Sequence, residues 1–182
     1  MAKSTTTRKA GAMQGKTSQL EEYFLSELKD VYGAEKQLVK ALPRMQKAAT
    51  TEELKEALEE HLAITQEQIA RLEEVFELMD KKPQSKKCEA MEGITKEGET
   101  VIKETESGSM TRDAAIIMAA QKVEHYEIAA YGGLVTLAKT MGRTEVADLL
   151  AQTLAEEKEA DQLLTEIAEN SINEEAEDED AE

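Results

Sequence analysis

Apolar residues recur every three or four positions along four long segments of the chain, which is the spacing of a helix with one buried face. The four segments cover residues 18–48, 51–80, 111–141 and 144–170. A shorter segment with the same spacing, residues 88–104, lies between the second and the third. The pattern therefore predicts four long helices and one short helix.

The lengths of the connections predict how these helices pack. Only a few residues join the first long helix to the second, or the third to the fourth, so each pair is expected to form an antiparallel hairpin. Residues 81–110 join the second helix to the third, and a connection of that length can return along the bundle. Two antiparallel hairpins joined by one long crossover are the ferritin-like arrangement. The predicted fold class is all-α: a ferritin-like four-helix bundle with a short extra helix in the crossover.

Both ends of the chain depart from the helical pattern. Residues 1–18 are rich in Ser, Thr, Lys and Gly, and residues 174–182 read EEAEDEDAE. Segments of such composition bury too little apolar surface to fold by themselves. We therefore expect a disordered basic tail over residues 1–18, a helical domain over residues 19–170 and a disordered acidic tail over residues 171–182.

The composition supports helices and limits the partners. The 182 residues include no Trp and only 3% aromatic residues, and the formal net charge is −17. This charge disfavours nucleic acid and anionic membranes as partners. We expect no membrane span and no secretory signal, because the chain has no apolar run of the length that either one needs. Cys88 is the lone cysteine, so an intrachain disulfide is excluded. We expect its thiol to be inert. We expect a cytoplasmic protein that binds neither nucleic acid nor membrane.

Six polar residues interrupt the apolar faces near the middle of the long helices. At the rise of a helix they lie about 16–29 Å from the hairpin turns, so all six are expected in one layer. A buried carboxylate is costly unless a cation or a hydrogen bond meets it. Five carboxylates with one imidazole suit iron, manganese or zinc. The six residues are Glu35, His61, Glu124, Glu127, Glu157 and Asp161.

Each of these residues also has an ordinary structural explanation. The chain has 39 acidic residues, so some of them fall on buried faces by chance. A glutamate at the edge of such a face can pair with Lys122 or Lys158, and His61 can bond to Tyr32 or Thr65. The pattern therefore leaves two hypotheses: a metal centre, and a metal-free buried polar layer in a non-enzymatic binding or structural protein.

Three segments within the predicted helices have a distinctive sequence. They read VYGAEKQL at residues 31–38, AAQKVEHYEIAAYG at residues 119–132 and TLAEEK at residues 153–158. These segments resemble the YciE/YciF family of bacterial ferritin-like proteins, and the resemblance covers residues 19–170. It implies a ferritin-like bundle, usually a homodimer, associated with stress responses. It also implies a di-metal carboxylate centre like that of rubrerythrin-like proteins, with iron oxidation or peroxide chemistry as the activity.

The resemblance assigns roles to the six residues. It implies that Glu35, His61, Glu124 and Glu157 hold metal, with Glu127 and Asp161 as bridging or outer groups. The chain departs from the family in the second long helix. Family members commonly have the run HLEET there, whereas this chain reads HLAIT at residues 61–65. Ile64 stands where a carboxylate is expected, so two ions, one ion and an empty site all stay open.

Overall fold

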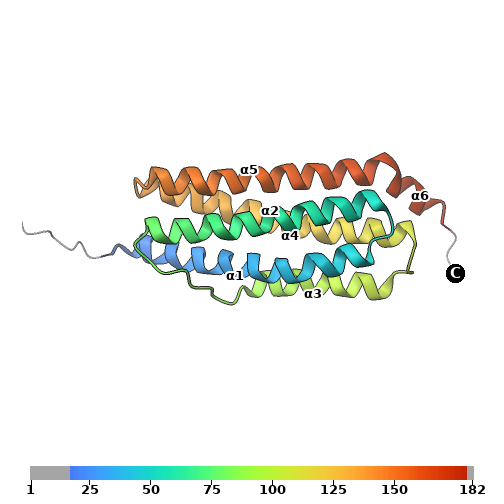
Figure 1. The fold of residues 1–182 in the computed structure, drawn as a ribbon, viewed down its shortest axis with the longest axis horizontal. Coiled ribbons are helices and arrows are strands. Elements are labelled where there is room, and N and C mark those ends of the chain that lie inside the picture. The colour runs from blue at the N-terminus through green and yellow to red at the C-terminus, as the bar shows by residue number, and fades with distance from the viewer. Residues whose placement is uncertain (1–16, 180–182) are drawn as a thin grey trace, which may run out of the picture.

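The computed structural model describes residues 17–179, which form an elongated bundle of long helices (Figure 1). Five helices make up the bundle, and a π-helical turn, η1, leads from them into a last short helix. They are α1 (Gln19–Ala48), α2 (Glu52–Leu78), α3 (Glu89–Glu104), α4 (Met110–Thr140), α5 (Thr144–Ile167), η1 (Ala168–Ile172) and α6 (Asn173–Glu177).

The helices pack as two hairpins joined by a crossover. Helices α1 and α2 form one hairpin, and α4 and α5 form the other. The crossover carries α3, which lies against α1 and α4 (Figure 1). This is the predicted ferritin-like four-helix bundle with a short extra helix, and the prediction is confirmed.

A buried aspartate ties the two hairpins together at one end. Asp113, in the first turn of α4, accepts hydrogen bonds from the backbone N–H groups of Thr50 and Thr51 at 2.6 and 2.8 Å. It also accepts one from the Thr51 hydroxyl at 2.8 Å. Two of these bonds pair backbone N–H groups of the turn that leads into α2, and all three fix the start of α4 against that turn.

The crossover passes very close to α1. The backbone N–H of Lys86 donates to the carbonyl of Lys29 at 2.9 Å. The carbonyl oxygen of Lys86 lies 1.8 Å from the point where a Cβ atom on Gly33 would stand. A side chain of any size at residue 33 would therefore displace the crossover, and only glycine fits without a shift.

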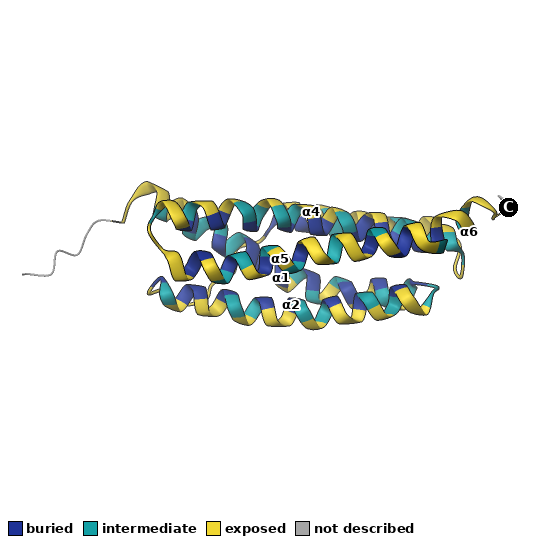
Figure 2. Cartoon of the chain, turned by 90° about the horizontal axis from the view of Figure 1, so that it is seen from above, coloured by how far each residue is buried: buried dark blue, intermediate teal, exposed yellow. Residues whose placement is uncertain are grey.

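The buried side chains form two apolar clusters, which lie along the facing sides of the helices (Figure 2). One cluster includes Phe24 and Phe76, and the other includes Leu38 and Met91. Each cluster takes residues from all four long helices. In α2, α4 and α5, buried polar residues lie between the segments that enter the two clusters, and in α1 the buried Glu35 lies at the boundary between them. The core is thus divided by a polar layer.

The helical chain runs further than the sequence predicts. A disordered tail is expected from residue 171, but η1 and α6 continue to Glu177. The reason is Ile172, whose side chain is 1% exposed and joins an apolar cluster. Beyond α6, the Glu179 carboxylate accepts hydrogen bonds from the first backbone N–H groups of α4 at 2.6 and 2.9 Å. The predicted tail residues 1–16 and 180–182 lie outside the described residues.

Candidate metal centre

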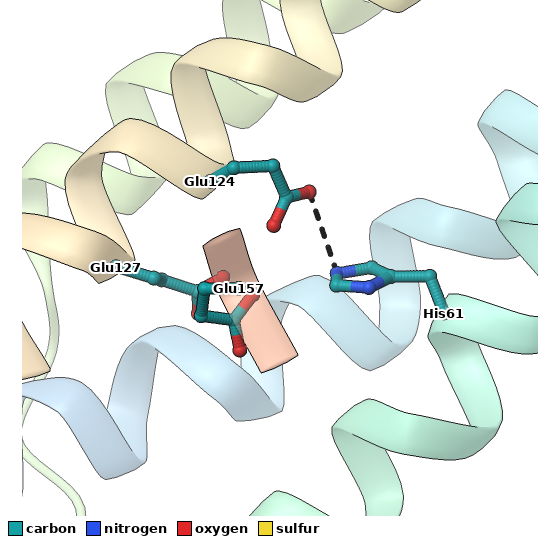
Figure 3. Close-up of side chains that lie close together, drawn as sticks. All are labelled: His61, Glu124, Glu127 and Glu157. Atoms are coloured by element: carbon teal, nitrogen blue, oxygen red, sulfur yellow. Dashed lines mark ion pairs between the residues drawn. The ribbon is translucent and has the colours of Figure 1, made fainter. Parts of the chain in front are cut away.

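Four buried residues from three helices point into one space in the middle of the bundle (Figure 3). His61 comes from α2, Glu124 and Glu127 from α4, and Glu157 from α5. Each offers one ligand atom, and these four atoms all lie within 4.8 Å of one another. Ligands of a single transition-metal ion lie up to about 4.4 Å apart, twice a metal–ligand bond. Small side-chain movements would therefore bring the four atoms around an ion.

The helical repeat delivers these side chains to one point. Glu124 and Glu127 are three residues apart on α4, so they project from the same face. His61 stands on the buried face of α2, where the Thr65 hydroxyl donates to its backbone carbonyl at 2.8 Å. The Nε2 atom of His61 lies 3.4 Å from Oε1 of Glu124, the contact that is dashed in Figure 3.

Glu35 adds a carboxylate from α1 at the edge of this group. Its side chain is fully buried and accepts a hydrogen bond from the Tyr131 hydroxyl. Glu35 is not one of the four residues whose ligand atoms converge. Its charge nevertheless raises the pKa of Glu127, so the two carboxylates are close enough to interact.

Most polar atoms of this group have no hydrogen-bond partner among the described residues. The unpaired atoms are both ring nitrogens of His61, both oxygens of Glu127, and Oε2 of Glu35, Glu124 and Glu157. Buried polar atoms without partners are rare in folded proteins, because each costs the free energy of its lost hydration. Their concentration at one point fits a site built to hold a cation.

Burial shifts the pKa of every titratable group here in the direction that favours the neutral form of the group. It raises the pKa of Glu35 to about 8, and the charge of Glu157 adds to the rise. Burial also raises the pKa values of Glu124 and Glu127 well above the ordinary range, and that of Glu157. It lowers the pKa of His61 to about 4, which leaves the neutral imidazole that binds metals. A divalent cation would favour the ionised carboxylates.

Sequence reasoning missed a chain of contacts that holds Glu157. The amide of Gln68 donates to Oε1 of Glu157 at 2.5 Å and to Oε2 of Glu156 at 3.1 Å. Arg71 in turn pairs with both oxygens of Glu156, at 2.7 and 2.8 Å. The signal was available, because Gln68 is seven residues after His61 and therefore shares its helix face.

Asp161 is the one predicted site residue that the structure places elsewhere. Its carboxylate faces the outside of the α4–α5 pair, where the Gln121 amide donates to it at 3.2 Å. The Nε2 atom of His125, which is largely exposed, lies 3.3 Å from it. Two turns after Glu157, the buried position of α5 belongs to Leu164, which is 5% exposed. Asp161 therefore does not share the space of the converging ligands.

The fold and this site define the class of protein: a ferritin-like helical bundle with a buried carboxylate–histidine cluster. The model of a family described as a domain of unknown function (DUF892) matches residues 19–177, and the chain belongs to this family. Over 159 residues it is 47% identical to Protein YciF of Escherichia coli K12, covering 87% of this chain and 95% of that protein. The resemblance to the YciE/YciF family is thereby confirmed.

Solved structures show the same fold. The crystal structure of the E. coli stress protein YciF matches with a TM-score of 0.81 at 46% identity, over 86% of this chain and 98% of that one. YcfI from Rhodopseudomonas palustris, described as a candidate structural protein, matches with a TM-score of 0.79 at 39% identity, over 84% and 97%. A protein from Xanthomonas campestris matches with a TM-score of 0.66 at 26% identity, over 83% and 92%. Among residues 17–179, no helix combines the length and hydropathy that crossing a membrane requires.

Proposed function

We propose that the protein is a stress-response protein with a transition-metal centre in the core of the bundle. The observation that carries the proposal is the convergence of His61, Glu124, Glu127 and Glu157 with their polar atoms largely unpaired. The stress-response role is proposed by analogy with the E. coli relative, whose structure is described as that of a stress protein.

The charge of the site favours two divalent ions. Four buried glutamates meet there, counting Glu35, and the imidazole of His61 is neutral. Two divalent cations would balance four carboxylates, and carboxylates readily bridge two ions. Iron is the first choice for such a mixed carboxylate and imidazole site, with manganese and zinc as alternatives. Bound iron would supply the one-electron steps needed for iron oxidation or peroxide chemistry.

The surrounding residues would orient the ligands and exclude water. Tyr131 holds one oxygen of Glu35 and Gln68 holds one oxygen of Glu157, which in each case leaves the second oxygen unpaired. The positive charge of Arg71 is matched by Glu156, so it does not neutralise the centre. The two apolar clusters close the layer from both ends of the bundle.

A metal-free polar layer is the second candidate. The raised pKa values allow the carboxyl groups to stay protonated and hydrogen-bonded without a cation. The description of the R. palustris relative as a candidate structural protein agrees with such a role. In this case the protein would act through binding partners, without catalysis.

Metal analysis of protein purified without chelator separates the two candidates. We expect one or two equivalents of iron, manganese or zinc, and loss of this metal in the double variant Glu124→Ala with Glu157→Ala. A matched control removes two exposed acids, Glu74→Ala with Asp148→Ala, and should keep the metal. Metal-free protein whose thermal unfolding does not respond to Fe²⁺, Mn²⁺ or Zn²⁺ would establish the polar layer instead. The homodimer and the cytoplasmic location stay predictions.

A further inference from the structure

A cleft between α2 and α5 leads from the surface to one end of the candidate metal centre. Its volume is about 170 Å³, and His61 and Glu124 are among the residues that line it. The other carboxylates of the centre, Glu35, Glu127 and Glu157, are not among the lining residues. The cleft therefore opens onto the His61–Glu124 end alone.

The walls of the cleft are mostly aliphatic. They come from α2 and α5, and Leu163, at 42% exposed, stands at the rim. The aliphatic lining consists of Ala57, Leu58, Ile64, Ala160, Leu163 and Leu164. Such walls favour a ligand with an apolar body, because burying apolar surface removes it from water.

The charged residues at the cleft are all acidic. Glu60 and Glu159 are exposed, and Glu156 is paired with Arg71. Among the described residues that line the cleft, none is Lys or Arg. An anion would thus be repelled at the rim. A cation would be attracted to these carboxylates, but it would lose hydration against the six aliphatic residues that make up most of the lining.

The volume sets the size of the ligand. An apolar cavity of about 150 Å³ binds benzene, so this cleft suits a molecule of about six non-hydrogen atoms. It also exceeds the space that one metal ion or one water molecule needs, since a water molecule takes about 30 Å³.

At the inner end of the cleft, the lining includes polar atoms of His61 and Glu124 that have no hydrogen-bond partner in the described part of the chain. His61 is 7% exposed and Glu124 is 2% exposed. Both ring nitrogens of His61 and Oε2 of Glu124 lack hydrogen-bond partners among the described residues. A single polar head group that can donate and accept hydrogen bonds would satisfy atoms of this kind.

We propose that the α2–α5 cleft binds a compact, uncharged molecule with a short aliphatic body and one hydroxyl or hydroperoxyl head. The head would meet His61 and Glu124, and the body would lie between the aliphatic walls. Short alcohols and short alkyl hydroperoxides belong to this class. The role of such a molecule as a co-substrate rests on the proposed metal centre, whereas its binding does not.

Three probes with the same tert-butyl body and different head groups test whether the cleft binds such molecules and whether it prefers an uncharged head. They are tert-butanol, which is neutral, pivalate, which is an anion, and tert-butylammonium, which is a cation. Each is titrated into metal-free protein with ¹³C-labelled methyl groups, and the signals of Leu58, Ile64 and Leu163 are followed by NMR. We expect saturable shifts with tert-butanol, with a Kd on the order of millimolar, and at least about tenfold weaker binding of both ions.

Two variants that fill the cleft, Ala160→Leu and Ala57→Leu, should abolish the shifts. Ala155→Leu, at an exposed position of α5 outside the cleft, is the matched control and should keep them. A cleft that only holds water would show no saturable shift with any probe, and tighter binding of tert-butylammonium would make it a cation route. Either result overturns the inference. Because the titration uses metal-free protein, its outcome is independent of whether the centre binds metal.

Discussion

Replacing Glu35 by Gln should change how the stability of the metal-free protein depends on pH. The substitution keeps the shape of the side chain and a carbonyl oxygen that can accept from Tyr131, but it removes the titration. The pKa of Glu35 rises from its ordinary value of 4.5 to about 8 in the folded protein, chiefly because of burial. Above pH 4.5 the unfolded chain therefore releases a proton that the folded chain keeps.

The magnitude follows from this difference in bound protons. The contribution of Glu35 is fully present below pH 4.5 and is lost as the pH rises to about 8. The loss is about 1.4 kcal/mol for each pH unit, or about 3 kcal/mol between about pH 5.5 and about pH 7.5. His61 acts in the opposite sense. Its pKa falls from 6.5 to about 4, so its contribution is lost as the pH falls below 6.5.

Urea unfolding at a series of pH values measures this effect. Metal-free wild type and Glu35→Gln are compared, with Glu74→Gln as the exposed control. Between about pH 5.5 and about pH 7.5, we expect the free energy of unfolding of wild type to fall by about 3 kcal/mol relative to that of Glu35→Gln. The control should follow wild type throughout. If Glu35→Gln also follows wild type, Glu35 is ionised in the folded metal-free protein and the buried layer is not as described.

Two further substitutions test the crossover and the departure from the family. Gly33→Ala should lower the free energy of unfolding by about 1–3 kcal/mol, because its Cβ meets a backbone carbonyl of the crossover. Gly133→Ala, with nothing within 4 Å of its Cβ, should instead raise it by up to about 1 kcal/mol in the same urea titration. Ile64→Glu should tighten Zn²⁺ binding in calorimetry by on the order of tenfold, because residue 64 lines the cleft beside the histidine. The exposed Ala63→Glu is its control, and equal affinities in both variants would show that residue 64 does not reach the ions.

The sequence predicts the helices and their topology well, because both depend on local signals. The apolar period marks each buried face, and the short and long connections distinguish hairpins from the crossover. The end of the domain was harder to predict. One buried apolar residue, Ile172, extends the helical chain into an acidic segment, and its burial depends on neighbours that are distant in sequence.

The sequence predicts the level of the candidate site along the bundle, but not which side chains face it. Counting the helical rise puts Glu35, Glu124 and Glu157 at one level, and the structure has them there. The period alone does not fix the rotation of each helix about its axis. Asp161 was therefore included although it faces outward, and Gln68 was missed although it bonds to Glu157.

The polar layer that splits the core also has a mechanical consequence for the whole rod. Each half of the bundle has an apolar core of its own, and the two meet across buried carboxylates. When those carboxylates are neutralised, the halves are joined and should melt as one cooperative unit. When they are ionised and unbalanced, mutual repulsion weakens the joint, and one half can open before the other. The supply of cations would then decide whether the rod is rigid from end to end or hinged at its midpoint.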